Sequence, residues 1–367
     1  MESLFTTAWQ KKAWWLWLLW PLSWLYRLIS WFNKKLYDIH IKSVYYSPVP
    51  VIVIGNITVG GSGKTPLIIA LVQYLQGKNI RVGVISRGYG GDTSQMPALV
   101  TPQSTPAQVG DEPCLIVQST ILQSSRGGSL SSGVPMAVCP NRGQAIELLL
   151  KHYPDTQLIL ADDGLQHHAL DRDKNWVVVD SDRGFGNAQV LPTGFLREPI
   201  KRLFDPDTTV IFHQRNWQDS PPFFKVESEG FLPKLLMTLE EQPLQPLLPQ
   251  ANLSLSLNPQ TVPKVIAITG IGFPQRFFNS VKRLGFDLVE LPFNDHHNFS
   301  LADFEDLPDL PMVITAKDAV KIQLLLQAYP NDFTQNLSQK IWVLPVVANL
   351  SAEVWAKLDK QLVELGI

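Results

Sequence analysis

The segment that most limits the folds open to this chain is a glycine-rich loop that follows an apolar run. The apolar run, residues 49–54, reads VPVIVI and predicts a buried strand. A helix is predicted after the loop as far as about residue 76, and residues 80–86 predict the next strand. A strand, a loop, a helix and a strand in this order form a βαβ unit, which predicts a parallel sheet.

The loop has the residues of a phosphate-binding loop, namely Gly60, Gly61, Ser62, Gly63, Lys64 and Thr65. Glycines let backbone N–H groups approach phosphates, and the helix N-terminus adds partial positive charge. We expect Lys64 to reach the β- and γ-phosphates and the Thr65 hydroxyl to bind Mg²⁺. The match is not strict, because Thr58 stands where the pattern has a further glycine. The sequence therefore predicts nucleotide binding, and the alternative is a glycine-rich turn with a chance lysine.

Two adjacent carboxylates follow another predicted strand. Residues 158–164 read LILADDG, so Asp162 and Asp163 should lie at the carboxyl edge of the sheet, where open α/β folds bind ligands. Without a cation these carboxylates would repel each other, and Mg²⁺ removes that repulsion. The alternative is a surface turn.

Composition narrows the class of protein. Hydrophobic residues make up 45% of the chain, which fits a packed core, and its 367 residues suggest two domains or one large α/β domain with additions. The net charge of −2 gives no global positive field, so we expect no nucleic-acid partner. Cys114 and Cys139 lack a CxxC spacing, so we expect two ordinary core residues in a reducing compartment.

The order of predicted elements suggests two α/β units. Strands are predicted in the first unit at residues 158–161, 176–179 and 209–212, and in the second at residues 264–269, 287–291, 312–315 and 341–346. Proline-rich residues 219–222 mark a boundary, and Ser351 is the expected N-cap of a final helix at residues 351–365. We predict an N-terminal membrane-associated helix at 1–40, a P-loop domain at 41–222, a smaller α/β domain at 223–350 and a closing helix at 351–367.

The N-terminal segment differs from the rest of the chain. Residues 13–32 read AWWLWLLWPLSWLYRLISWF and hold six of the 11 tryptophans. Twenty helical residues cover ~30 Å, and tryptophan prefers the membrane interface. No small-residue cleavage site follows, so we predict a membrane helix, spanning or lying in the interface; the alternative is a buried core helix.

Several motifs, taken together, resemble those of the tetraacyldisaccharide 4′-kinase (lipid A 4′-kinase) family. They appear in the order GNITVGGSGKTP (55–66), SRGYGG (86–91), GDEP (110–113), NR (141–142), DDGLQHH (162–168), LPTGFLREP (191–199) and NDHHNFS (294–300). The resemblance runs from the N-terminal hydrophobic helix to about residue 321. It is the order and spacing of the motifs, more than any one of them, that is specific.

The resemblance implies transfer of phosphate from ATP, with Mg²⁺, to the 4′-hydroxyl of a tetraacyl disaccharide-1-phosphate lipid in lipid A biosynthesis. It implies a P-loop domain, a smaller C-terminal α/β domain and an active site between them. Asp111 and His296 would act at the reacting hydroxyl, with the carboxylate as base and the imidazole orienting it, once the domains close. Asp162, Asp163 and Glu198 would surround the metal and phosphates, and the substrate side would be lined by Tyr89, Arg142, Gln166 and Arg197. The resemblance also implies a protein at the inner (cytoplasmic) membrane, with its active site facing the cytoplasm, and we infer no protein partner.

Other interpretations of these residues stay open. Asp111 could cap a helix, His296 could be structural, Arg197 and Glu198 could form a surface ion pair, and Tyr89 could pack in a turn. Residues 315–321 read TAKDAVK where the family usually has TEKDAVK, so a role for that stretch is doubtful.

Rival functions also remain. They are a P-loop phosphotransferase with another membrane or small-molecule acceptor, a phosphoesterase suggested by Asp295-His296-His297, and a non-enzymatic nucleotide switch. A zinc site built from the paired histidines is disfavoured, since neighbouring strand residues point to opposite faces.

Overall fold

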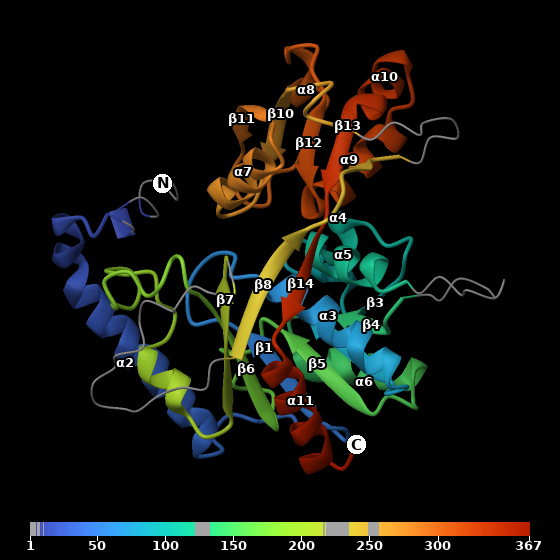
Figure 1. The fold of residues 1–367 in the computed structure, drawn as a ribbon. Coiled ribbons are helices and arrows are strands. Elements are labelled where there is room, and N and C mark those ends of the chain that lie inside the picture. The colour runs from blue at the N-terminus through green and yellow to red at the C-terminus, as the bar shows by residue number, and fades with distance from the viewer. Residues whose placement is uncertain are drawn as a thin grey trace.

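The computed structural model describes Phe5 and residues 8–9, 11–121, 133–215, 217, 235–248 and 257–367. The strands in these residues form two sheets, a larger one in the lower part of Figure 1 and a smaller one above it. The predicted domain boundary at residue 222 lies outside the described residues. The α/β class and the P-loop sheet are confirmed.

The larger sheet is mostly parallel. Its strands lie in the order β14 (Val346–Leu350), β8 (Leu235–Glu241), β7 (Thr208–Gln214), β6 (Lys174–Asp180), β1 (Val51–Gly55), β5 (Leu158–Asp162), β2 (Val82–Ser86), β4 (Met136–Val138) and β3 (Ala98–Val100). The two outermost pairs, β14–β8 and β3–β4, are antiparallel, and all other neighbours are parallel.

Helices cover both faces of this sheet, which is why its central strands are apolar throughout. In β1 the side chains of Ile52 and Ile54 pack in one core with helices α3 (Lys64–Gly77), α5 (Asp111–Ser119) and α11 (Ala352–Glu364). Val51 and Val53 point the other way, into a second core with α6 (Arg142–His152). Short helices complete the lobe: η2 (Thr93–Gln95), α4 (Pro106–Val109) and η3 (Ile200–Phe204).

The smaller sheet has the order β11 (Asp287–Pro292), β10 (Lys264–Thr269), β12 (Met312–Thr315), β13 (Ile341–Leu344) and β9 (Gln245–Pro246). Only β9 is antiparallel to its neighbour. Helix α7 (Pro274–Arg283) packs on one face. The other face is covered by α8 (Ala302–Glu305), α9 (Ala316–Ala328) and α10 (Asp332–Lys340).

One predicted strand is wrong. Residues 341–346 were expected to form a single strand, but Pro345 separates β13 from β14, and the two strands belong to different sheets. Proline has no N–H to give to a ladder, which fits a change of sheet at this residue. Together with its antiparallel partner β8, β14 links the two lobes (Figure 1).

The closing helix α11 belongs to the larger lobe. The buried indole of Trp176 donates to Gln361 Oε1 at 2.8 Å, which anchors α11 to β6. Ser351 occupies the expected N-cap position, but its side chain makes no capping hydrogen bond.

The N-terminal segment consists of a 3-10 helix, η1 (Trp14–Leu19), followed by α2 (Trp20–Asp38), at the left of Figure 1. Pro21 lies in the first turn of α2, where a missing N–H costs no helical bond. Ser23 Oγ donates to Thr193 Oγ1 at 2.7 Å, and Tyr26 Oη donates to the Arg197 carbonyl at 2.9 Å. Within the described residues, every helix falls short of the length and apolarity that crossing a membrane requires.

Candidate functional site

A pocket of about 1000 Å³ lies between the two lobes. The larger lobe contributes the glycine-rich loop, the ends of β2 and β5 and the start of α5, and the smaller lobe contributes the starts of α7 and α9 and the loop after β11. The residues predicted from sequence that line this pocket are Gly60, Gly61, Ser62, Gly63, Lys64, Thr65, Tyr89, Asp111, Arg142, Asp162, Asp163, Gln166, Arg197 and His296. Glu198 is the one predicted site residue that does not line it.

The glycine-rich loop needs glycine for geometric reasons. Gly60 and Gly63 have φ of 92° and 94°, in the left-handed region that favours glycine. A Cβ on Gly63 would lie 3.0 Å from both His213 Nδ1 and Met237 Cε, which pack beneath the loop. The loop is therefore seated closely on β7 and β8, and Lys64 begins α3 directly after it.

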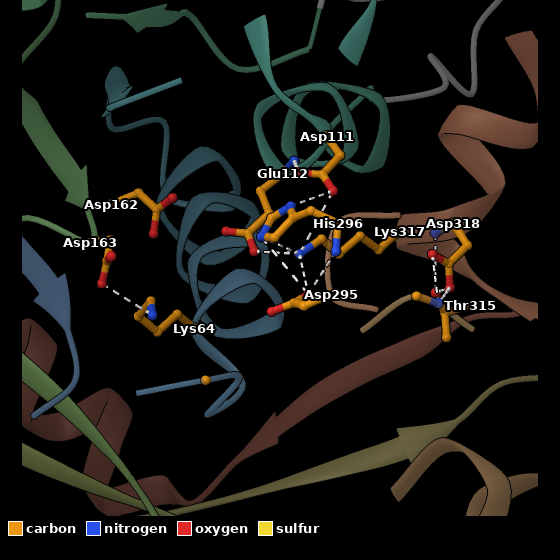
Figure 2. Close-up of polar contacts among 12 residues, drawn as sticks. Lys64, Asp111, Glu112, Asp162, Asp163, Asp295, His296, Thr315, Lys317 and Asp318 are labelled. Atoms are coloured by element: carbon orange, nitrogen blue, oxygen red, sulfur yellow. Dashed lines mark hydrogen bonds and ion pairs between the residues drawn. The ribbon is translucent and has the colours of Figure 1, made fainter. Parts of the chain in front are cut away.

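The sheet register brings the two aspartates to this loop. In the parallel pair β1–β5, Ile54 is level with Asp162, so β5 ends beside the start of the loop. Lys64 Nζ lies 3.2 Å from Asp163 Oδ1, as Figure 2 shows. Arg197 Nη1 also lies 3.1 Å from Asp163 Oδ2. Asp163 is held with φ of 46°, a backbone conformation unusual for a residue with a Cβ.

The two neighbouring carboxylates have opposite electrostatic environments. Burial, together with the charges of Glu112 and Asp163, raises the pKa of Asp162. Burial would also raise the pKa of Asp163, but the cations of Lys64 and Arg197 lower it below its usual value. Asp162 Oδ1 is buried and has no hydrogen-bond partner among the residues that the structure describes.

Arg142, Gln166 and Glu198 have supporting contacts. The buried Arg142 guanidinium donates to the Cys139 carbonyl at 3.0 Å and to the Asp162 carbonyl at 3.1 Å, which ties the start of α6 to the end of β5. Gln166 Nε2 donates to Glu198 Oε1 at 2.6 Å. Glu198 therefore lies behind Gln166, away from the pocket surface.

Asp111 and His296, which are 185 residues apart, meet across the two lobes. His296 Nδ1 lies 3.1 Å from Asp111 Oδ2 (Figure 2). Asp111 is the first residue of α5 and is only 3% exposed. His296 has φ of 60°, and its N–H donates to the Gly270 carbonyl at 3.0 Å, which positions the ring over α5. In this structure the lobes are already close enough for the contact that the sequence expected after closure.

Two lysines of α9 complete the surroundings of Asp111. Lys321 Nζ lies 3.2 Å and Lys317 Nζ 3.7 Å from Asp111 Oδ2. Burial would raise the pKa of Asp111, but the His296 hydrogen bond and the lysine charges lower it well below its usual range. Sequence reasoning missed both lysines because it treated residues 315–321 as doubtful. The sequence did contain a signal for them: Lys317 and Lys321 are four residues apart, a spacing that places both ammonium groups on the same face of a helix.

The start of α9 is held rigidly. The buried Asp318 carboxylate accepts hydrogen bonds from Thr315 Oγ1 at 2.6 Å and Thr269 Oγ1 at 2.9 Å. It also accepts from the Gly270 N–H at 3.2 Å. The Gly270 carbonyl in turn accepts from the His296 N–H. Asp318 is therefore bonded both to the start of α9, next to Lys317, and to the residue that holds the His296 backbone, which fixes Lys317 relative to the imidazole.

A second contact between the lobes lies beside the glycine-rich loop, and sequence reasoning missed it. Arg276 of α7 donates to the buried Asp180 carboxylate at 2.8 Å. It also lies 3.2 Å from His213 Nδ1, and that nitrogen is 3.0 Å from the Ser62 carbonyl. Burial and the charge of Arg276 lower the pKa of His213 to about 4. The only sequence signal was that Asp180 and His213 lie near the carboxyl ends of predicted strands.

The site fits Mg²⁺ better than zinc. In the described residues no three His, Cys, Asp or Glu side chains are grouped so as to hold a metal. His297 is paired instead with Asp303, at 3.2 Å. Mg²⁺ needs only one or two protein carboxylates beside water and phosphate oxygens, and Asp162 Oδ1, which has no partner within the described residues and lines the same pocket as Thr65, suits it.

Comparisons with known proteins agree with this geometry. The family model described as "Tetraacyldisaccharide-1-P 4′-kinase" matches residues 15–363. A tetraacyldisaccharide 4′-kinase from Psychrobacter cryohalolentis is 50% identical, covering 100% of this chain and 98% of that protein. One from Pasteurella multocida is 41% identical, covering 94% of each. The crystal structure of "apo" form LpxK from Aquifex aeolicus in complex with ATP has a TM-score of 0.68 and 27% identity, covering 95% of this chain and 99% of that one.

Proposed function

The chain belongs to the tetraacyldisaccharide-1-P 4′-kinase family, and from this premise we propose how its residues transfer phosphate. The enzyme phosphorylates the 4′-hydroxyl of the tetraacyl disaccharide-1-phosphate precursor in lipid A biosynthesis, with ATP as donor. One observation supports the proposed roles most directly. The glycine-rich loop of the larger lobe and the His296–Asp111 contact, which joins the two lobes, line the same pocket.

The larger lobe binds the donor. Backbone N–H groups of the glycine-rich loop and the N-terminus of α3 face the phosphates of ATP. Lys64 exchanges its ion pair with Asp163 for the β- and γ-phosphates, and Arg197 keeps Asp163 paired when Lys64 leaves. Thr65 and Asp162 are the residues that would hold Mg²⁺, which, when bound, neutralises charge on the transferring phosphate.

On the acceptor side, the contacts favour His296 as the proton acceptor. Asp111 is almost fully buried and already accepts from the Glu112 N–H at 3.0 Å, besides its contacts with His296 and both lysines of α9. A carboxylate with so many donors is a weak base. The His296 side chain is 27% exposed and lines the pocket.

We therefore assign proton acceptance to His296 Nε2 and orientation of the ring to Asp111, the reverse of the roles expected from the sequence. As the 4′-oxygen attacks the γ-phosphorus, the bond from that phosphorus to the β,γ-bridging oxygen breaks, ADP leaves, and Nε2 takes the hydroxyl proton. The carboxylates of Asp111 and Asp295 then stabilise the imidazolium.

The N-terminal segment is proposed to bind the surface of the inner membrane, with the pocket facing the cytoplasm. Its docked side includes Ser23 and Tyr26, and its other side exposes a broad apolar patch made of Trp14, Trp17, Leu18, Trp20, Leu22, Trp24, Leu25, Leu28, Ile29, Trp31 and Phe32. An apolar patch of this kind marks a membrane or protein contact, and its tryptophans favour the membrane interface. Tyr26 also lines the pocket, so a lipid acceptor in the membrane lies beside the active site.

A labelled-phosphate assay tests the proposal. The purified protein is incubated with γ-³²P-ATP, Mg²⁺ and tetraacyl disaccharide-1-phosphate in mixed micelles. The label is expected to appear on the 4′-oxygen of the lipid. The same sugar without acyl chains is expected to be a poor acceptor at equal concentration. Equal transfer to the deacylated sugar would contradict the role given to the membrane patch, and label on another oxygen would contradict the placement of the acceptor at His296.

A further inference from the structure

The ammonium group of Lys317, at the start of α9, lies within 4 Å of three carboxylates and of the His296 ring. Its Nζ lies 3.1 Å from Glu112 Oε1, 3.7 Å from Asp111 Oδ2, 3.9 Å from Asp295 Oδ1 and 3.4 Å from His296 Nε2. Figure 2 shows it among these side chains, on the far side of the pocket from Lys64. The Lys317 side chain is 16% exposed and, through Asp318, sits on a rigid helix start.

The contact with His296 determines which ring nitrogen carries the proton. An ammonium group has three hydrogen-bond donors and no acceptor. Its place beside Nε2 therefore favours the tautomer with a lone pair on Nε2 and a proton on Nδ1. That proton is the one donated to Asp111 at 3.1 Å. The positive charge at 3.4 Å also opposes protonation of the ring before the acceptor arrives.

The balance of charge around the ring shows why this is needed. The groups in contact with the His296 ring are Asp111 from α5, Asp295 from its own loop, Lys317 from α9, and the Tyr89 ring, whose centroid is 4.8 Å away. Glu112 and Lys321 lie one contact further out, paired with Lys317 and Asp111. Two carboxylates therefore contact the imidazole, and Lys317 is the ammonium group that opposes them there.

We propose that Lys317 is a positioning residue for proton transfer: it keeps His296 neutral with Nε2 unprotonated, and it ties the His296 loop to α5 of the other lobe. The proposal rests on the proposed function, since it takes Nε2 as the proton acceptor. Glu112 holds Lys317 when the hydroxyl displaces it from Nε2, so the lysine stays in the pocket as a fixed positive charge. Burial would lower the pKa of Lys317, but Glu112, Asp111 and Asp295 raise it, so Lys317 stays charged throughout the working range.

The test is the pH dependence of kcat/KM for the lipid, measured on the full-length Lys317→Met enzyme between pH 5.5 and 8.5. Removing a like charge next to an ionisable group changes its proton affinity by about one pH unit or more. The acidic limb of the profile is therefore expected to move about one unit to higher pH, so that the loss relative to wild type is about tenfold greater at pH 5.5 than at pH 8.5. KM for ATP is expected to change less than about twofold, because Lys317 is on the acceptor side. A loss that is the same at every pH would overturn the proposal.

Two further variants keep the test decisive if Lys317→Met folds poorly. Lys317→Arg keeps the charge and is expected to keep the wild-type acidic limb. Glu112→Gln leaves Lys317 less neutralised, so its acidic limb is expected to move to lower pH, opposite to Lys317→Met. A Glu112→Gln profile that is unmoved or shifted to higher pH would also overturn the proposal.

Controls separate this inference from the proposed function. Lys340→Met removes an exposed lysine of the same lobe, paired with Asp309, and is expected to leave the profile unchanged. His296→Asn is measured in parallel. If it keeps wild-type activity, the assignment of Nε2 fails and the inference fails with it. If it is inactive while Lys317→Met keeps the wild-type profile, only the role of Lys317 is refuted.

Discussion

The contact between Asp111 and His296 predicts strong energetic coupling in a double-mutant cycle. The singles are Asp111→Asn, which keeps the side-chain volume, and His296→Ala. General base assistance typically contributes ~10²- to 10⁴-fold, so each single is expected to lower kcat within that range, equivalent to about 2.7–5.5 kcal/mol in activation free energy. Because the two side chains act on one proton transfer, the double variant should lose little more than the worse single.

The coupling free energy is then about as large as the smaller single effect, at least ~2.7 kcal/mol. The assay is kcat at saturating ATP and lipid, with thermal unfolding as a check on folding. The lowered pKa of Asp111 gives its carboxylate a stabilising role that is present above its unfolded pKa of ~3.9 and lost as the pH falls further. The difference in Tm between Asp111→Asn and wild type should therefore be larger at pH 7 than at pH 3.

The neighbouring histidine, His297, offers a matched control for His296. His297 and Asp303 form a pair at 3.2 Å, almost the same distance, but neither lines the pocket. His297→Ala and Asp303→Asn are expected to change stability while leaving kcat within about twofold, as for residues that take no part in the transition state. If the losses of the Asp111 and His296 variants multiply, so that the double variant is ~10⁴- to 10⁸-fold slower, the two residues act independently and the pair must be abandoned.

The remaining predictions concern the donor side and the membrane. Lys64→Ala is expected to lower phosphate transfer by ~100-fold or more with little change in Tm, since it removes a phosphate contact and no core volume; unchanged transfer would refute the phosphate-loop assignment. Asp162→Asn is expected to raise the Mg²⁺ concentration for half-maximal activity by ~10-fold or more, and an unchanged Mg²⁺ titration would show that this carboxylate does not bind the metal. Deleting residues 1–33 is expected to release the protein from phospholipid vesicles in sedimentation and to lower lipid phosphorylation more than ATP hydrolysis, and continued sedimentation would reveal a second membrane-binding surface. Tyr26→Phe alone should show part of that loss of activity, because the Tyr26 hydroxyl donates to the Arg197 carbonyl. Trp31→Ser, on the exposed face, should weaken vesicle binding without this additional loss of activity.

Patterns local in the sequence predicted donor-side residues that line one pocket in the structure. An apolar strand, glycines and Lys64 in a row specify a phosphate loop because all these residues are neighbours along the chain. Asp162 and Asp163 could be placed near the loop because parallel strands end at a common edge, and the β1–β5 register confirms that placement. Glu198 had no such constraint, and the structure places it behind Gln166.

The sequence by itself determined most of the parallel strands, the glycine-rich loop after the first of them and an apolar N-terminal segment, since each depends on residue spacing within about twenty positions. The resemblance had already placed Asp111 and His296 at the acceptor, but only the tertiary structure showed that Lys317 and Lys321 of α9 surround them, because positions about 111, 296 and 317 have no local signal that joins them. The tertiary structure also decided that β13 and β14 belong to different sheets. The roles of Asp111 and His296 depend on the same long-range contacts: how readily each group accepts a proton is set by burial and by the charges around it, and those charges are supplied by both lobes.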